Sequence, residues 1–336
     1  MVTSRPSREP GRPMAEPDTA AAGEGGQEAA ARDAIRERLA PVLSGSLRSK
    51  RVVIAGLGSG GSQTAEALVR SGVERLVLID PESVEPANIS RAVYTMGDVG
   101  SAKTDALQRR LRDINPLVDC RLVATSVQDI PAADLDDIVS EADLVIGATD
   151  DPAAQRALNH FAFHRMIPAV FAGVYARGHG GEVIFTVPGV TRCYRCATAS
   201  RHDSEATGRQ LDYGTGRLAA EPALGSDILH IVTASVKIAL SLLEVVEEGP
   251  DVPLRDFMMG ALERGYNYLI ISTVPRYGAF GDLFDGVPGQ YAYQSAWLVT
   301  MGTDDCPVCG DDPLDPAAVI HGGAPDLAKL RTVEGS

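Results

Sequence analysis

A glycine-rich turn between two short apolar runs, in residues 51–80, narrows the folds open to this chain more than any other feature. The stretch reads RVVIAGLGSGGSQTAEALVRSGVERLVLID, and β-branched residues stand in its first and last segments. Short runs of this kind are typical of strands buried on both faces of a parallel sheet. The helix-forming segment between them ends at Gly72, a residue that commonly follows a helix. The stretch therefore predicts a strand–helix–strand unit of a doubly wound α/β domain.

The same alternation of strands and helices continues after residue 80. We predict helices at residues 101–116, 134–141 and 151–166, and strands at residues 119–126, 142–150 and 168–174. From residue 178 the pattern changes to a strand with Gly and Pro turns, a long polar loop, a strongly apolar helix and further strands. The predicted fold is a Rossmann-like, mainly parallel sheet extended by C-terminal antiparallel strands.

Composition divides the chain and excludes some functions. Residues 1–30 are rich in Pro, Gly, Ala and Glu and contain no aromatic residue, so we predict a disordered tail there. Residues 31–310 form the predicted folded domain, and residues 311–336 a polar tail. A net charge of −14 argues against nucleic-acid partners and anionic membranes, which attract clustered Lys and Arg. We see no long apolar span or leader, so we expect a cytoplasmic protein.

The glycine turn itself predicts a nucleotide site. Gly56, Gly58 and Gly61 follow the pattern G-x-G-x-x-G between a predicted strand and a predicted helix. Glycines let the backbone approach a phosphate closely, and the helix N-terminus offers free N–H groups. Asp80 ends the second strand, where a carboxylate can accept both ribose hydroxyls. This pattern fits NAD, FAD or ATP, and a tight turn without any ligand stays open as an alternative.

Charged residues after the second strand favour ATP. Asn88, Arg91 and Lys103 follow Asp80 in the next loop and helix, where cations would neutralise an α-phosphate and a departing pyrophosphate. Asp150 ends a neighbouring strand, and its carboxylate could hold Mg²⁺. The structural alternatives are a surface Arg91, a solvated Lys103 and Asp150 as the N-cap of the helix that follows it.

Four of the five cysteines form two C-x-x-C pairs, Cys193 with Cys196 and Cys306 with Cys309. Four thiolates are the ligand set of a structural, tetrahedral zinc site. A reactive dithiol is the alternative. Cys120 lies in a strand-like segment and is interpreted as a small buried residue.

Six motifs stand in one order between residues 47 and 310: GLGSGG, LIDPESVEPANISR, VGSAK, IGATD, CYRC and DCPVCG. In this the chain resembles the ThiF/MoeB family, the bacterial relatives of ubiquitin-activating enzymes. The resemblance implies a ThiF-like adenylation domain over residues 31–310, with a nucleotide-binding part (31–177) and a part (178–310) that holds a crossover loop, the buried helix and a Cys₄ zinc knuckle. It also implies ATP- and Mg²⁺-dependent adenylation of a carboxylate, usually the C-terminal glycine of a ubiquitin-like or sulfur-carrier protein, by a homodimer.

The resemblance also assigns roles by position. Asp80 resembles the ribose-binding aspartate, Asp150 the catalytic, Mg²⁺-coordinating aspartate, and Arg91 and Lys103 the catalytic cations. The predicted nucleotide-binding set is Gly56, Gly58, Ser59, Gly60, Gly61, Asp80, Asn88, Arg91, Lys103 and Asp150. The cysteines of CYRC and DCPVCG look like the zinc ligands of the family.

Departures from the family pattern leave alternatives open. Many members carry a relay cysteine after the first knuckle, but residues 197–305 contain none, so we expect a separate nucleophile to take the acyl group. Arg36 and Arg38 are weak candidates for an arginine that reaches a partner subunit. The acid could instead be a short peptide or a small metabolite. An NAD-dependent oxidoreductase and a non-catalytic scaffold that binds a ubiquitin-like partner are the alternatives from other classes.

Overall fold

A single eight-stranded sheet organises the chain in the computed structural model, which describes residues 34, 37–199, 223–245 and 253–317. The strand order is β3-β2-β1-β4-β5-β6-β7-β8. Their bounds are β1 Arg51–Ala55, β2 Arg75–Ile79, β3 Asp119–Val123, β4 Leu144–Gly147, β5 Ala169–Val174, β6 Gly180–Thr186, β7 Tyr268–Ser272 and β8 Gln294–Leu298.

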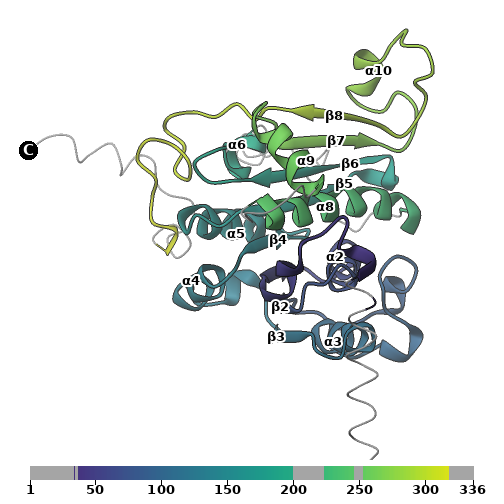
Figure 1. Ribbon diagram of the computed structural model, residues 1–336, viewed down its shortest axis with the longest axis vertical. Coiled ribbons are helices and arrows are strands. Elements are labelled where there is room, and N and C mark those ends of the chain that lie inside the picture. Colours follow the sequence, from purple (N-terminus) through teal and green to yellow (C-terminus); the bar gives the residue numbers. More distant parts are fainter. Residues whose placement is uncertain (1–33, 35–36, 200–222, 246–252, 318–336) are drawn as a thin grey trace, which may run out of the picture.

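The pairing of the strands confirms the predicted fold class. Strands β3, β2, β1, β4 and β5 run parallel, whereas β6, β7 and β8 continue the sheet antiparallel (Figure 1). The turn of the strand order lies between β1 and β4, where the chain crosses from one half of the parallel sheet to the other. In such sheets a ligand binds at the carboxyl ends of the strands beside that switch point.

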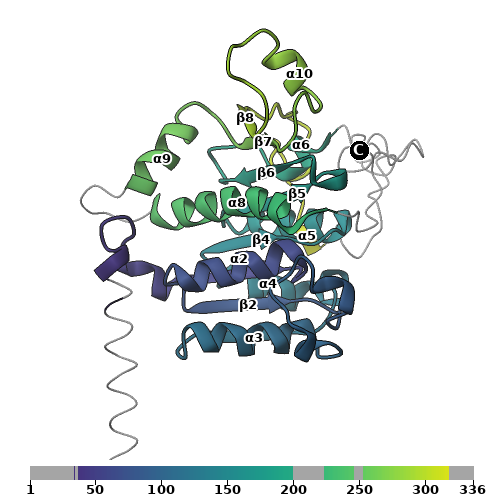
Figure 2. The same cartoon turned by 90° about the vertical axis from the view of Figure 1, so that its right-hand side faces the viewer.

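Helices cover both faces of the sheet, as Figure 2 shows. One apolar cluster joins the sheet to helices α2, α3, α8 and α9, and a second joins the opposite face to α4, α5 and α6. Their bounds are α2 Ser59–Arg70, α3 Lys103–Ile114, α4 Ala132–Ser140, α5 Pro152–His164, α6 Tyr194–Ala197, α8 Gly225–Val245 and α9 Pro253–Leu262. The alternation of apolar residues in β1 explains these layers, because Val52 and Ile54 belong to the first cluster and Val53 and Ala55 to the second.

Helix α8 is the apolar helix that the sequence predicts at residues 227–249. It packs against α2, α9, β5 and β6. Its length and composition would also suit a membrane span, but 67% of its most apolar 18 residues are buried within the fold. We therefore describe it as a core helix of this sheet.

Other predictions meet the structure less completely. Residues 34 and 37–39 are helical. The predicted N-terminal tail, residues 318–336 of the C-terminal tail and most of the polar loop lie outside the described residues. Helix α9 was not predicted, nor was the short helix α10 (Phe280–Leu283) in the connection from β7 to β8. The domain boundaries themselves stay predictions.

Candidate active site

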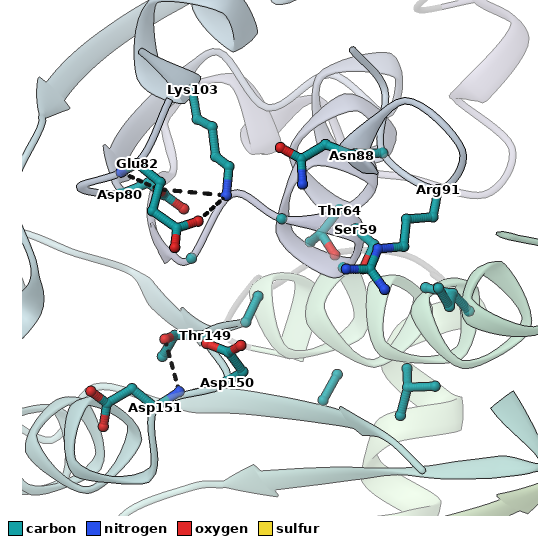
Figure 3. A pocket seen from close by; sticks show the side chains of 18 of the residues that line it. Ser59, Thr64, Asp80, Glu82, Asn88, Arg91, Lys103, Thr149, Asp150 and Asp151 are labelled. Carbon is teal, nitrogen blue, oxygen red and sulfur yellow. Dashed lines mark hydrogen bonds and ion pairs between the residues drawn. The ribbon is translucent and has the colours of Figure 1, made fainter. Parts of the chain in front are cut away.

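A pocket of about 820 Å³ lies at the carboxyl ends of the parallel strands. This volume is within the usual range for a site that holds a nucleotide-sized ligand. The pocket wall contains nine of the ten predicted nucleotide-binding residues, namely Gly56, Gly58, Ser59, Gly60, Asp80, Asn88, Arg91, Lys103 and Asp150. Figure 3 shows the side chains of Ser59, Asp80, Asn88, Arg91, Lys103 and Asp150 around one space. Gly61 is buried beneath the turn instead.

Two glycines of the turn are required by close backbone packing. Gly56 has a φ of 87°, and a Cβ atom there would lie 2.5 Å from the backbone nitrogen of Thr149. A Cβ atom on Gly61 would lie 1.8 Å from the carbonyl oxygen of Gly56. The turn can therefore pass beside the β4–α5 connection only with glycine at both positions. At Gly58 a Cβ atom would meet no protein atom within 4 Å, which leaves open space above the N-terminus of α2.

Asp80 connects this turn to the end of β2. Its Oδ2 accepts a hydrogen bond from the backbone N–H of Leu57 at 2.6 Å, and its Oδ1 accepts one from Glu82 at 2.9 Å. A carboxylate has about four acceptor positions, so each oxygen keeps capacity for a further donor. Burial raises the pKa of Asp80, although the Leu57 N–H and the nearby Lys103 ammonium act against that rise.

Lys103, at the start of α3, is a buried cation and not a solvated surface residue. Only 4% of it is exposed. Its Nζ lies 4.0 Å from Asp80 Oδ1 and donates a short hydrogen bond to Glu82, whose side chain is mostly exposed. The structural alternative of a solvated lysine is therefore wrong. The ammonium is held at the pocket wall by carboxylates of the β2–α3 loop.

Asp150 and Asp151 have different surroundings. Asp151 is the N-cap of α5, because its Oδ1 accepts hydrogen bonds from the backbone N–H groups of Ala153 at 2.7 Å and Ala154 at 3.2 Å. The alternative that Asp150 caps this helix is therefore wrong. Burial raises the pKa of the Asp150 carboxyl, and the carboxylates of Glu82 and Asp151 add to this rise. A carboxylate in such surroundings would be stabilised by a bound divalent cation.

Arg91 and Asn88 line the pocket from the β2–α3 loop. Asn88 Oδ1 accepts a hydrogen bond from the backbone N–H of Glu85 at 2.8 Å, which completes a capping box around a short 3-10 helix (Pro86–Asn88). In Figure 3 the Arg91 guanidinium and the Lys103 ammonium point into the same space, and Asp150 faces them from the opposite wall. Arg91 is half-buried and not an ordinary surface arginine.

Sequence reasoning missed Glu82 and Thr149 as wall residues. Glu82 follows Asp80 closely at the end of a predicted strand, and that position was the available signal. Thr149 Oγ1 accepts a hydrogen bond from the backbone N–H of Asp151 at 3.1 Å. This hydrogen bond depends on the geometry of the turn, so no signal in the sequence identified Thr149 as a wall residue.

The four cysteines of the two C-x-x-C pairs, here called the four-cysteine site, lie together away from the pocket. All four Sγ atoms are within 4.8 Å of one another. Cys193 Sγ is 3.8 Å from Cys306 Sγ, and Cys196 Sγ is 3.5 Å from Cys309 Sγ. These separations are too long for disulfides, at about 2.05 Å. They match four sulfurs about 2.3 Å from one tetrahedral Zn²⁺, which lie about 3.8 Å apart.

The crowding of the four thiols favours thiolate at one side of this site. Hydrogen bonds from the thiols of Cys193, Cys196 and Cys309 hold the pKa of Cys306 well below its usual range. Cys309, beside Cys193, has its pKa lowered to about 6. Thiolates are the form that binds a metal. Cys120 is buried elsewhere, as predicted, and burial raises its pKa to about 11.

A Rossmann-like sheet with a glycine turn, a carboxylate at the end of β2 and two cations around one pocket is typical of a nucleotide-binding α/β protein. The sequence pattern of the ThiF family matches residues 34–256. The chain therefore belongs to the ThiF family, and the resemblance seen in the motifs is confirmed.

Two named relatives illustrate this membership. The Sulfur carrier protein ThiS adenylyltransferase of Escherichia coli (strain K12) is 28% identical over 272 residues, which are 80% of this chain and 90% of that relative. Ubiquitin-like modifier-activating enzyme 5 of Drosophila pseudoobscura pseudoobscura is 32% identical over 162 residues, or 45% of this chain. The matched part is only 40% of the length of the Drosophila enzyme.

Solved structures share the fold. A crystal structure of E. coli MccB with ATP aligns with a TM-score of 0.56 and 20% identity, over 79% of this chain and 68% of that chain. A structure of MccB in complex with N-formylated MccA aligns with a TM-score of 0.56 and 19% identity, over 79% of this chain and 69% of MccB. At this identity the alignments show a common architecture.

Proposed function

We propose that this chain is an ATP- and Mg²⁺-dependent adenylyltransferase that activates a carboxylate. The observation that carries the proposal is the placement of the Lys103 ammonium and the Arg91 guanidinium opposite the Asp150 carboxylate, above the glycine turn (Figure 3). Two cations and one metal-binding carboxylate suit chemistry at a phosphate. Family membership and the similarity to a ThiS adenylyltransferase support this proposal over an NAD-dependent oxidoreductase.

Different residues of the pocket would bind the nucleotide and stabilise charge during this reaction. The turn at Gly58 and Gly60 would receive the phosphates at the N-terminus of α2, and Asp80 would accept the ribose hydroxyls. A carboxylate oxygen of the acid attacks the α-phosphorus, the bond from that phosphorus to the bridging oxygen breaks, and pyrophosphate leaves. Arg91 and Lys103 would stabilise the charge on these oxygens.

Asp150 would hold the Mg²⁺ ion. When bound, this ion neutralises charge on the phosphate oxygens. Asp150 suits this role because its carboxylate lies on the pocket wall and its neighbour Asp151 satisfies the N-terminus of α5 instead. Asn88 would add a polar contact to the phosphates.

The acid that we favour is the C-terminal glycine of a ubiquitin-like or sulfur-carrier protein. The support is that the match with the ThiS adenylyltransferase spans most of both chains. Because residues 197–305 contain no cysteine, the acyl adenylate would pass to a separate nucleophile. We also propose that the chain works as a homodimer, that it is cytoplasmic and that zinc occupies the four-cysteine site.

A short peptide or small acid is the second candidate. Two observations favour it: the missing relay cysteine, and the aromatic contacts of Trp297 in β8 with Phe257 of α9 and with Tyr266. MccB, a structural neighbour, has been solved in complex with N-formylated MccA. The aromatic cluster around Trp297 could shape a different acid-binding surface.

ATP–pyrophosphate exchange tests the proposal. The purified chain is incubated with labelled pyrophosphate, ATP and Mg²⁺, and with sulfur-carrier proteins ending in Gly-Gly, short peptides or amino acids. We expect exchange with one class of acid and loss of exchange in Asp150→Ala. Exchange with none of them at saturating ATP and Mg²⁺ contradicts adenylation. Equal exchange in wild type and Asp150→Ala contradicts the assigned mechanism.

A further inference from the structure

A chain of buried contacts runs from the four-cysteine site to the turn that carries Asp150. Tyr194 stands between Cys193 and Cys196, at the start of α6. Its hydroxyl donates a short hydrogen bond to Gln155 Oε1 in α5. Gln155 Nε2 in turn donates to the carbonyl oxygen of Thr149 at 2.7 Å. Thr149 immediately precedes Asp150, so the contacts end at the peptide group that leads into this residue.

The chemistry of the groups determines which atom donates and which accepts in each of these hydrogen bonds. The Thr149 carbonyl oxygen can only accept, so the amide nitrogen of Gln155 must face it. The amide oxygen then faces Tyr194, whose hydroxyl must donate. Gln155 is 1% exposed and Tyr194 is 4% exposed. Because water does not reach these groups, breaking either hydrogen bond would leave a buried polar atom without a partner. The free-energy cost of that loss keeps both side chains in place.

The Tyr194 ring supports the same turn through a second path. Its centroid lies 4.3 Å from that of Phe171 in β5. Phe171 in turn packs so closely on Gly147, at the end of β4, that a Cβ atom at Gly147 would lie 2.5 Å from the Phe171 ring. The backbone N–H of Tyr194 also donates to Asn159 Oδ1 in α5 at 2.9 Å. Tyr194 thus contacts α5 directly and reaches the end of β4 through Phe171.

The Thr149 carbonyl belongs to the planar peptide group that joins Thr149 to Asp150. A hydrogen bond to this carbonyl sets the orientation of that plane, and with it the direction in which the Asp150 side chain leaves the backbone. Asp151 N–H donates to Thr149 Oγ1 at 3.1 Å and so holds the next peptide group. Gln155 therefore fixes the orientation of the Thr149–Asp150 peptide group, which the N-cap hydrogen bonds of Asp151 do not fix.

We infer that Tyr194 and Gln155 are positioning residues that hold the Asp150 carboxylate in its metal-binding direction from the side of the four-cysteine site. The inference rests on the proposed function, because it assigns Mg²⁺ binding to Asp150. By this inference the four-cysteine site helps to align the pocket, in addition to joining distant parts of the chain. Partners that orient a metal ligand commonly change metal affinity when they are replaced.

The test is the Mg²⁺ dependence of ATP binding, measured by calorimetry on the zinc-loaded full chain without any acid substrate. Tyr194→Phe removes the hydroxyl and keeps the ring on Phe171, and Gln155→Met removes both hydrogen bonds at similar volume. We expect each variant to need about 10- to 100-fold more Mg²⁺ for half-maximal binding. ATP binding without Mg²⁺ and the zinc content should stay at wild-type values.

Tyr268→Phe is the matched control. Its hydroxyl also donates a short hydrogen bond to a buried group, Glu182 of β6, in the antiparallel part of the sheet. We expect this variant to lose stability like Tyr194→Phe and to keep the Mg²⁺ dependence of the wild type. A general loosening of the fold would instead shift all three variants together, and that result would overturn the inference.

Asp150→Asn separates the failure of the inference from the failure of the proposed function. If the wild type shows no Mg²⁺-dependent ATP binding, or Asp150→Asn retains it, the proposed function is wrong. If Asp150→Asn loses it while Tyr194→Phe keeps the wild-type Mg²⁺ requirement, the inference alone is wrong. Should Gln155→Met lose zinc or unfold, Tyr194→Phe decides the question, because it deletes a single oxygen atom.

Discussion

Lys103 Nζ lies 4.0 Å from Asp80 Oδ1, and both side chains are almost completely buried at the pocket wall. The pair joins the end of β2 to the first turn of α3, and Glu82 provides a second carboxylate to the same ammonium. A buried cation is stable only where carboxylates and hydrogen bonds surround it. The cation therefore stays at the pocket wall before any ligand enters.

Lys103→Met tests the role of this cation. We expect ATP–pyrophosphate exchange to fall about 100- to 1,000-fold in kcat/KM, as for the loss of one preorganised charge-stabilising donor. Arg109→Met is the control on the same helix, because Arg109 pairs with Asp98 at the exposed surface. Exchange equal to wild type in Lys103→Met would show that the lysine has no part in the reaction.

Replacing each of two adjacent aspartates should separate activity from stability. Asp150→Ala should abolish exchange and leave the melting temperature near the wild-type value, because the Asp150 side chain is exposed at the pocket wall and Asp151, not Asp150, caps α5. Asp151→Ala should lower the free energy of unfolding by about 1 kcal/mol, the usual cost of losing an N-cap. Thermal unfolding and exchange assays on both variants check this. If Asp150→Ala proves less stable than the wild type, our assignment of the structural role to Asp151 alone is wrong.

Adjacent glycines in the turn should respond differently to alanine. Gly61→Ala places Cβ 1.8 Å from the Gly56 carbonyl oxygen, so we expect a loss of at least about 3 kcal/mol or no folded protein. At Gly60 a Cβ atom would meet only Val232 Cγ2, at 4.0 Å. Gly60→Ala should keep the fold, gain up to about 1 kcal/mol in the helix and weaken ATP binding, because Gly60 lines the pocket. Circular dichroism melts and ATP titrations measure both effects.

The stability contributions of Asp80 and Asp98 should depend on pH with opposite signs. Burial raises the pKa of Asp80 above its ordinary value of 3.8. The folded chain then holds a proton that the unfolded chain releases, so the contribution of Asp80 to the free energy of unfolding falls as pH rises from 3.8 through its folded pKa. The backbone N–H of Thr95 lowers the pKa of Asp98, so its contribution is present above the ordinary value and disappears as pH falls through the folded pKa.

Urea unfolding of Asp80→Asn and Asp98→Asn at pH values from about 2.5 to 7 measures this contrast. Relative to wild type, Asp80→Asn should become more stable as pH rises, and Asp98→Asn should become less stable. Parallel pH profiles for the two variants would contradict the assigned causes of the pKa shifts.

Metal content provides the test of the four-cysteine site. Elemental analysis should find about one zinc per chain in the wild type and almost none in Cys309→Ser, with a lower melting temperature because zinc binding and folding are coupled. Cys120→Ser is the control, since Cys120 is buried in β3 and should leave the zinc content unchanged. A full zinc content in Cys309→Ser would exclude this cysteine as a ligand.

Local patterns were enough to predict most helices and strands and nine residues of the pocket wall. Apolar runs and glycine turns carry their information within a few neighbouring residues, and parallel strands bring their carboxyl ends to one edge whatever their length. Helix α9 was not predicted, although Pro253 stands at its start and Gly265 follows its end; packing against α8 stabilises it.

The linear order of residues therefore decided the doubly wound sheet, the glycine turn and the identity of the charged and cysteine side chains around it. Tertiary structure alone decided that Lys103 is buried, that Asp151 and not Asp150 caps α5, and that Gln155 connects Tyr194 to the Asp150 turn. The physical reason is that burial, pKa and hydrogen-bond partners depend on groups distant in sequence, which come together only when the sheet and its helices pack.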